Sequence, residues 1–282
     1  MRMRLLAAVG MVMVAGQASA DSGERWARAS APVAGPPQVL GSAAAGCISG
    51  AVPLPADGDG WQVLRLQRNR FYSHPNTIAF LRRLAGRAKA ESLGTLLVAD
   101  MSQPRGGPMP SGHASHQNGL DVDIWYRLPD HPLSDDERAD PQGISMVKGA
   151  AIDRRHWTPA QARLVELAAR SPEVDRIFVN PPIKVELCHR AGADRAWLSK
   201  IRPWFGHDEH FHVRLSCPAG SIGCVPQAPV PDGDGCGAEV ASWLAKGTIQ
   251  IPSDKPNHRN PTLPAACQAV LGQPGTATVG RR

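Results

Sequence analysis

Hydrophobic and polar residues alternate in three short segments of the chain, which predicts β-strands with one buried and one polar face. The segments are residues 61–66, 121–126 and 210–215, and the alternation is strict in the last of them. A continuous apolar run at residues 95–101 predicts a buried strand, and residues 174–179 predict a further one. The chain is therefore expected to contain a β-sheet.

Helices are predicted where apolar residues recur three or four positions apart behind a capping signal. Thr158 and Pro159 are one such signal, an N-cap followed by proline at the first helical position. The predicted helices are residues 77–89, 159–170, 182–191 and 194–201. Because helices and strands do not follow a regular βαβ rhythm, the predicted class is α+β, with a small antiparallel sheet flanked by helices.

Four segments lack this periodicity. Residues 21–46 are rich in Ala, Pro and Gly, and residues 218–282 are rich in Pro and Gly. Both are predicted to be irregular arms that disulfides hold on the body. Residues 102–120 are predicted to be a loop, and residues 127–157 a long polar insertion. We expect residues 21–282 to form one domain.

The first twenty residues have the order of a secretory signal peptide. A basic start at residues 1–4 precedes an apolar run from Leu5 to Ala15 and the small residues 18–20. A membrane span needs about 20 apolar residues, and this run is shorter. We therefore predict cleavage after Ala20 and export of the mature chain, and no later segment is apolar for long enough to span a membrane.

Composition narrows the classes of partner. The formal net charge falls from +6 to +4 when Arg2 and Arg4 leave with the signal peptide. A modestly basic exported protein can be drawn to anionic polymers such as the cell wall. No basic helix with interleaved aromatic residues is present, so the sequence does not predict nucleic-acid binding.

Six cysteines follow the predicted cleavage site. An even number in an oxidising compartment predicts three disulfides, for which fifteen pairings exist. Cys217 and Cys224 flank a short loop with Pro and Gly, so this local pair is plausible. No two cysteines form a CxxC pair, which disfavours a structural zinc knuckle.

Two clusters of histidine and aspartate carry the candidate chemistry, residues 111–123 and residues 207–212. Residues two apart on a strand face the same way, so Asp121 shares a face with Asp123, and His210 shares one with His212. If the two strands are neighbours, His116, Asp123 and His212 can converge on one ion. Two imidazoles and a carboxylate with one open position are the ligands of a catalytic zinc.

The remaining histidines of the clusters have predicted roles around that ion. His210 would lie beside the metal without binding it, as a general base for the attacking water. His113 and His207 could bind an additional metal, orient a ligand, or simply be polar loop residues. Trp204 and Phe205, just before the second cluster, are expected in the core or a pocket wall. Other schemes fit less well, because the chain has neither GxSxG nor HExxH and its cysteines are expected to be paired.

These motifs resemble those of penicillin-insensitive murein endopeptidases, zinc peptidases related to lysostaphin-type enzymes and D-Ala-D-Ala carboxypeptidases. The resemblance is closest at Gly112–Gln117, at Gly119–Asp123, and from Arg202 through His207 to Leu215. Shorter matching stretches lie at residues 46–48, 176–181 and 233–239, so the resemblance covers nearly the whole chain after the signal peptide.

The resemblance implies a periplasmic enzyme that hydrolyses D-alanyl–meso-diaminopimelyl cross-links of peptidoglycan. It implies Zn²⁺ on His116, Asp123 and His212, with His210 as the catalytic histidine. It suggests that His113 can hold an additional metal and that His207 lines the site. Further ligands in the family are an Asp and a His three residues apart, and here Asp153 and His156 have that spacing within differing flanks. The implied disulfides are Cys47–Cys267, Cys188–Cys236 and Cys217–Cys224.

Two alternative functions remain at this point. The same metal site could serve a D,D-carboxypeptidase that removes a terminal D-Ala, since pocket shape decides which bond is cut. A zinc-containing wall-binding protein without turnover is the other alternative, and His210 beside the ligands argues against it.

Overall fold

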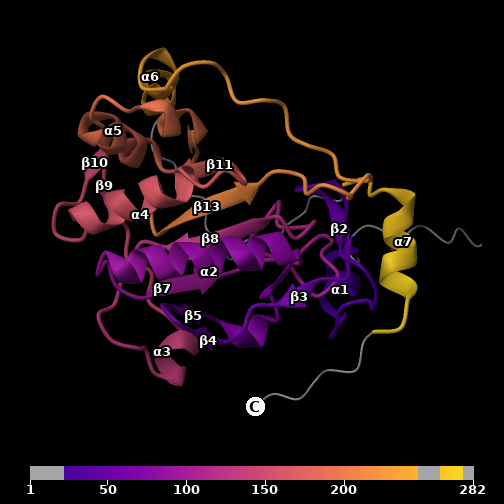
Figure 1. Ribbon diagram of the computed structural model, residues 1–282. Helices are drawn as coiled ribbons and strands as arrows, with labels where there is room; N and C mark the ends of the chain where they lie inside the picture. Colours follow the sequence, from indigo (N-terminus) through magenta and orange to yellow (C-terminus); the bar gives the residue numbers. More distant parts are fainter. Residues whose placement is uncertain (1–21, 247–260, 276–282) are drawn as a thin grey trace, which may run out of the picture.

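The computed structural model describes residues 22–246 and 261–275 of the chain, so the predicted signal peptide lies outside the described residues. Its main element is a seven-stranded sheet in the order β12-β11-β13-β8-β7-β5-β4 (Figure 1). These strands are β4 (Asp57–Gly58), β5 (Trp61–Val63), β7 (Leu96–Ala99), β8 (Asp121–Trp125), β11 (Val174–Val179), β12 (Ile201–Pro203) and β13 (His210–Leu215). The α+β class and the five predicted strands are confirmed.

The sheet is larger than predicted and mixed in direction. Its centre, β11-β13-β8-β7, is antiparallel, but β11 pairs with β12 and β5 pairs with β7 in parallel. The prediction of a small antiparallel sheet therefore holds only for these central strands. The outer strands β4 and β12, which were not predicted, are two and three residues long, too short to show a period in sequence.

Two helices, α2 (Pro75–Ala90) and α4 (Pro159–Ala169), pack against one face of this sheet (Figure 1). Each begins at a cap followed by proline: His74 accepts the Asn76 amide, and Thr158 forms a capping box with Gln161. Apolar residues of both helices share one core with alternate residues of β8 and β13. The opposite face of β8 and β13 is thereby left for other chemistry.

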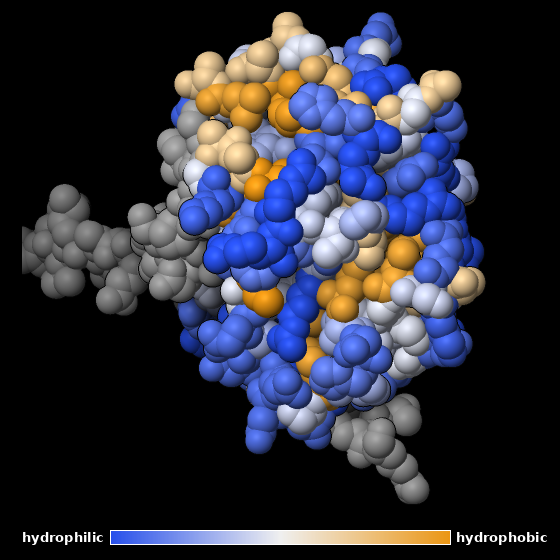
Figure 2. Space-filling view, turned by 90° about the vertical axis from the view of Figure 1, so that its left-hand side faces the viewer, coloured by the Kyte–Doolittle hydropathy of each residue, from blue (hydrophilic) through white to orange (hydrophobic). Residues whose placement is uncertain are grey.

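Further elements surround β11 and β12. Helix α5 (Pro181–Arg190) and the 3₁₀ helix η2 (Ala196–Lys200) correspond to the two short helices predicted there. On the side of the molecule where Figure 1 draws α5 and α4, the surface is largely hydrophilic (Figure 2). Its charges form ion pairs such as Arg163–Glu91 and Arg170–Asp194.

The insertion at residues 127–157 has local structure that periodicity did not predict. It contains α3 (Asp135–Ala139) and the hairpin of β9 (Val147–Lys148) and β10 (Ala151–Ile152). Ser134 and Glu137 form a capping box at the start of α3. That S-x-x-E signature was readable in the sequence.

The two arms are more regular than predicted. The N-terminal arm contains α1 (Ser22–Ala27) and β1 (Gln38–Ser42), which pairs with β2 (Ala45–Ser49). The C-terminal tail contains α6 (Ala238–Ala245) and α7 (Ala265–Gly272). Short pieces complete the chain: β3 (Val52–Pro53), β6 (Tyr72–Ser73) and the 3₁₀ helix η1 (Leu66–Arg68).

Three disulfides hold these arms, and they are the pairs that the family resemblance implied. Cys47–Cys267 joins β2 to α7, and Cys188–Cys236 joins α5 to the segment before α6. Cys217–Cys224 closes a short loop after β13. These bonds, together with a small hydrophobic cluster around Trp26 and Val270, hold the C-terminal tail against the rest of the domain. No helix of the described residues is long and apolar enough to cross a membrane.

Candidate metal centre

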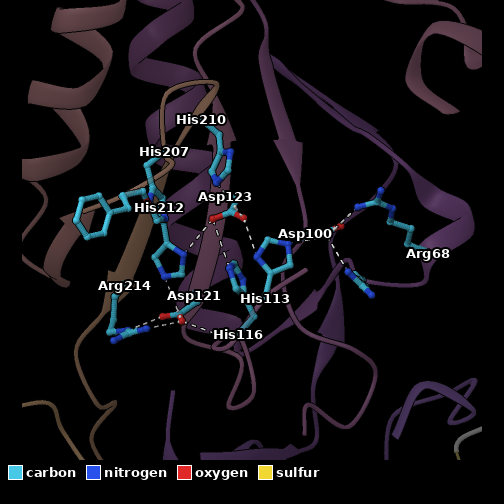
Figure 3. A network of polar contacts seen from close by, with 12 residues as sticks. Arg68, Asp100, His113, His116, Asp121, Asp123, His207, His210, His212 and Arg214 are labelled. Carbon is cyan, nitrogen blue, oxygen red and sulfur yellow. Dashed lines mark hydrogen bonds and ion pairs between the residues drawn. The ribbon is translucent and has the colours of Figure 1, made fainter. Parts of the chain in front are cut away.

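The two predicted clusters meet on the open face of β8 and β13. The strands are antiparallel neighbours, with His212 opposite Asp123 and Arg214 opposite Asp121. Since side chains alternate across a strand, Asp121, Asp123, His210 and His212 lie on one face (Figure 3). The pleat and the register therefore place His212 directly opposite Asp123, with His210 and Asp121 on the same face at either side of this pair.

His116 reaches this face from the loop before β8. Its backbone has a positive φ of 65°, and its amide donates a hydrogen bond of 3.1 Å to Asp121 Oδ2. The next residue holds the loop, because Gln117 O accepts the Gly107 amide and Gln117 N donates to Ala43 O. A Cβ on Gly106 would lie 1.9 Å from Gln117 O, so glycine is required for this approach. The side chain of His116 is completely buried.

Two histidines face Asp123 at the spacing of metal ligands. Asp123 Oδ1 lies 3.4 Å from His116 Nε2 and 3.1 Å from His212 Nδ1. Ligands of a tetrahedral zinc, each about 2.0–2.1 Å from the ion, lie roughly 3.4 Å from one another. Both ring nitrogens of His116 and Asp123 Oδ1 are buried without a hydrogen-bond partner among the described residues. Buried polar atoms normally have one, so the donor set fits a divalent metal ion.

Asp121 forms a second layer behind these residues. Arg214 donates from Nε and Nη2 to its two carboxylate oxygens, each at 2.8 Å. Asp121 Oδ2 also lies 3.2 Å from His212 Nε2. His116, Asp121 and His212 are close enough to form a ligand group themselves. The oxygens of Asp121 are already engaged, however, so this carboxylate is better placed to orient His212 and His116 than to bind an ion.

Electrostatics keeps the carboxylates ionised. Burial acts to raise the pKa of Asp121, but the Arg214 guanidinium and His212 hold it well below the ordinary value. Burial also acts to raise the pKa of Asp123, and the neighbouring histidines outweigh it. An ionised Asp123 is the form that binds a metal.

The two ligand-like histidines differ. Burial lowers the pKa of His116 to about 4, so its imidazole is neutral at pH 7 and can bind a metal. Burial acts to lower the pKa of His212 too, but Asp121 and Asp123 outweigh it and raise this pKa to about 9. In the protein without metal, His212 is therefore the imidazolium that pairs with the two carboxylates.

His210 lies at the mouth of the site. Its side chain is 26 % exposed, and its Nε2 is 3.5 Å from Asp123 Oδ2. Burial lowers its pKa below the ordinary histidine value, which leaves the ring neutral at pH 7. A neutral imidazole that is open to solvent beside a ligand can accept a proton.

His113 lies on the opposite side of Asp123 from His212 (Figure 3). Its Nδ1 is 3.5 Å from Asp123 Oδ2, and its Nε2 is 2.9 Å from Asp100 Oδ2. Asp100 also accepts from Arg68 and Arg70. Burial acts to raise the pKa of Asp100, but His113 and the two guanidinium groups keep it low. Asp100 follows β7 and lies outside both sequence clusters, so it was not predicted as a site residue. With His116 and Asp123, His113 forms a second ligand-like group.

His207 borders the site without reaching Asp123. Its Nδ1 contacts Phe205 O at 2.9 Å, and its ring centroid is 5.3 Å from that of His210. Burial holds its pKa well below the ordinary value. Phe178 of β11, which lies in the matching stretch 176–181, packs against His207 and His212, with ring centroids 6.2 and 5.4 Å apart.

Asp153 and His156 do not join the cluster. The Asp153 carboxylate is held by the Arg155 guanidinium, and His156 Nδ1 is 3.5 Å from it. Neither residue belongs to the ligand-like groups of the described residues, His113–His116–Asp123 and His116–Asp121–His212. The similar spacing in sequence does not therefore bring these two residues to the site.

The site combines buried histidines and aspartates on the antiparallel centre of a sheet with an accessible histidine beside them. Metal-dependent hydrolases have sites of this type. A family model described as penicillin-insensitive murein endopeptidase matches residues 39–272. The chain belongs to this family, and it is a peptidase.

Similar proteins support the assignment over most of the chain. A protein named penicillin-insensitive murein endopeptidase from Yersinia enterocolitica is 49 % identical over 249 residues, which are 87 % of this chain and 90 % of that protein. A relative of the same name from Haemophilus influenzae is 48 % identical and covers 88 % of both chains. One from Klebsiella pneumoniae is 42 % identical over 97 % of this chain and 99 % of its own.

Proposed function

We propose that this protein is a zinc-dependent murein endopeptidase that hydrolyses D-alanyl–meso-diaminopimelyl cross-links of peptidoglycan. Family membership supports the substrate class. The observation that supports a metal is the position of Asp123 Oδ1, which lies 3.4 Å from His116 Nε2 and 3.1 Å from His212 Nδ1. Both ring nitrogens of His116 and Asp123 Oδ1 are buried without a hydrogen-bond partner among the described residues. Two imidazoles and one carboxylate suit Zn²⁺ and leave one position open.

Each side chain has a role in this proposal. When bound, zinc would supply Lewis-acid polarisation of the peptide carbonyl and would acidify the attacking water. His210 accepts the proton of that water at Nε2 and returns it to the leaving amine. Asp121 fixes the ring of His212, and Arg214 keeps Asp121 ionised. His207 and Phe178 form the wall beside His210 and His212.

Location in the cell is part of the proposal. Peptidoglycan lies outside the cytoplasm, and three disulfides form in an oxidising compartment. The basic and apolar start of the sequence would direct export, with cleavage after Ala20. The mature protein recovered from the periplasm should begin at Asp21, and recovery of the uncleaved chain from the cytoplasm would contradict this.

Digestion of purified cross-linked muropeptide dimers, resolved by mass, tests the activity. Metal-loaded protein should convert dimers to monomers, a chelator should stop the reaction, and added Zn²⁺ should restore it. His116→Ala should be inactive with or without Zn²⁺, while Ile222→Ala, which changes a fully exposed side chain, should match the wild type. Release of terminal D-Ala from pentapeptide monomers, with dimers intact, would instead make the protein a D,D-carboxypeptidase. If neither reaction occurs, a non-catalytic role in wall binding remains, and sedimentation with sacculi would test it.

A further inference from the structure

A solvent-exposed tryptophan lies beside the metal centre. Trp204 is 47 % exposed, and it is the one aromatic residue among the exposed large hydrophobic residues of the described chain. From the sequence, Trp204 was predicted to lie in the core or a pocket wall. Ligand sites are lined mainly by hydrophobic and aromatic side chains, so an exposed indole beside a candidate catalytic centre is available for a ligand contact.

Trp204 is connected to the metal centre through one ring. Phe178 packs against His212 at 5.4 Å between ring centroids and against Trp204 at 5.6 Å. The distance between the Trp204 and His212 ring centroids is therefore at most the sum of these two separations. An extended chain of roughly three residues, at about 3.4 Å each, spans a similar distance. A polymer held at the metal centre can extend to Trp204.

The indole is held firmly in place. Its backbone amide donates to Val179 O at 2.8 Å, and its ring packs at 5.3 Å from Trp243 of α6. Helix α6 is itself fastened, because the Cys188–Cys236 disulfide precedes it and Glu239 accepts from Arg202 of β12. A ring fixed before binding loses little entropy when a ligand stacks on it.

We infer that Trp204 binds an N-acetylhexosamine ring of the glycan strand that carries the peptide stem, an inference that rests on the proposed function. One face of a pyranose presents C–H groups that are made slightly positive by the ring oxygens. The face of an indole is negative, so the two surfaces attract when stacked. Stem peptides consist of small residues and of residues with carboxylate or amino groups, none of which offers a flat face of C–H groups to stack on an indole. Trp204 and Trp243 would thus form a sugar subsite continuous with the catalytic site.

The experiment compares two substrates that share the same cross-link. One is a dimer that carries its disaccharides, and the other is the same dimer after an amidase has removed them. Trp204→Ala should lower kcat/KM about tenfold on the sugar-bearing dimer, mainly through KM, and leave the sugar-free dimer unchanged. Trp204→Phe, which retains a flat ring, should recover most of the loss. Ile222→Ala, an exposed apolar control, should have no effect on either substrate.

Direct binding provides a readout that is independent of catalysis. Wild-type protein should bind peptide-free glycan strands with a change in tryptophan fluorescence, and Trp204→Ala should bind them at least about fivefold more weakly. Equal losses on both dimers would overturn the inference and assign Trp204 to the peptide stem. Unchanged kinetics with unchanged strand binding would overturn it as well. If wild-type protein cuts neither dimer, the proposed function fails, and the strand-binding comparison alone decides the subsite.

Discussion

On one face of β8 and β13, Val122, Ile124 and Phe211 are fully buried in a core shared with α2 and α4. On the other face, one residue along each strand, Asp123 and His212 have charged groups at 3.1 Å. Both faces are tightly packed, but the first is held by apolar burial and the second by ion pairs and atoms left for a metal. Period-two alternation is therefore enough to place a stabilising core and a reactive site within the same residues.

The strongest test of this separation is His210→Ala. This change should lower kcat on muropeptide dimers by about 10²–10⁴-fold, because the proposed proton acceptor is lost. Zinc content and thermal stability should remain those of the wild type, since the side chain is partly exposed and is not among the three proposed ligands. Kinetics, metal analysis and a melting curve on the same preparation check all three expectations. Activity within threefold of the wild type would remove His210 from the mechanism.

Phe211→Ala, at the next residue, should do the reverse. Phe211 is completely buried against Tyr126 and the core, so truncation should lower the free energy of unfolding by about 3–5 kcal/mol. Once folded, the variant should still bind zinc and turn over dimers, because its side chain points away from the site. Urea unfolding followed by circular dichroism gives the first value, and turnover at low temperature gives the second. A loss below about 1 kcal/mol would show that the core relaxes around the cavity.

The site was largely predictable from sequence because its residues lie in two short segments with a strict local period. The sequence did not predict that β8 and β13 are neighbours or how their residues pair, and the structure shows both. Asp100 and Phe178 could not be predicted in the same way. Neither lies in a cluster of histidine and aspartate, although Phe178 belongs to the matching stretch 176–181, and the strand order is what brings them to Asp123 and His212.

The arms were predicted less well for a different reason. The β1–β2 hairpin is rich in Ala, Gly and Ser, which have weak strand propensity, and its pairing is stabilised by long-range contacts such as Cys47–Cys267. Helices α6 and α7 have eight residues each, a length at which an isolated helix is marginal. A disulfide beside or within each one stabilises it in the folded chain, and sequence periodicity does not report that.

The layer behind the ligands should have a smaller effect than either face. Asp121→Asn should weaken zinc binding about 10–100-fold, because His212 loses an anionic partner for its second nitrogen. Competition with a chelator of known affinity, at a pH above 9, measures the loss. Circular dichroism and thermal unfolding must accompany it, since Arg214 also loses part of a buried ion pair. An affinity equal to that of the wild type would mean that Asp121 serves the fold alone.

The smallest expected effect is the pH dependence of the difference in zinc affinity between the wild type and Asp121→Asn. With a pKa of about 9, His212 is protonated in metal-free protein at pH 7, and a metal can bind only after that proton leaves. Wild-type affinity should therefore rise about tenfold per pH unit from pH 7 and level off near 9. Asp121→Asn removes the largest contribution that raises this pKa, so its affinity should level off at lower pH. The ratio of wild-type to variant zinc affinity should increase between pH 7 and about 9. A ratio independent of pH would show that Asp121 orients His212 without raising its pKa.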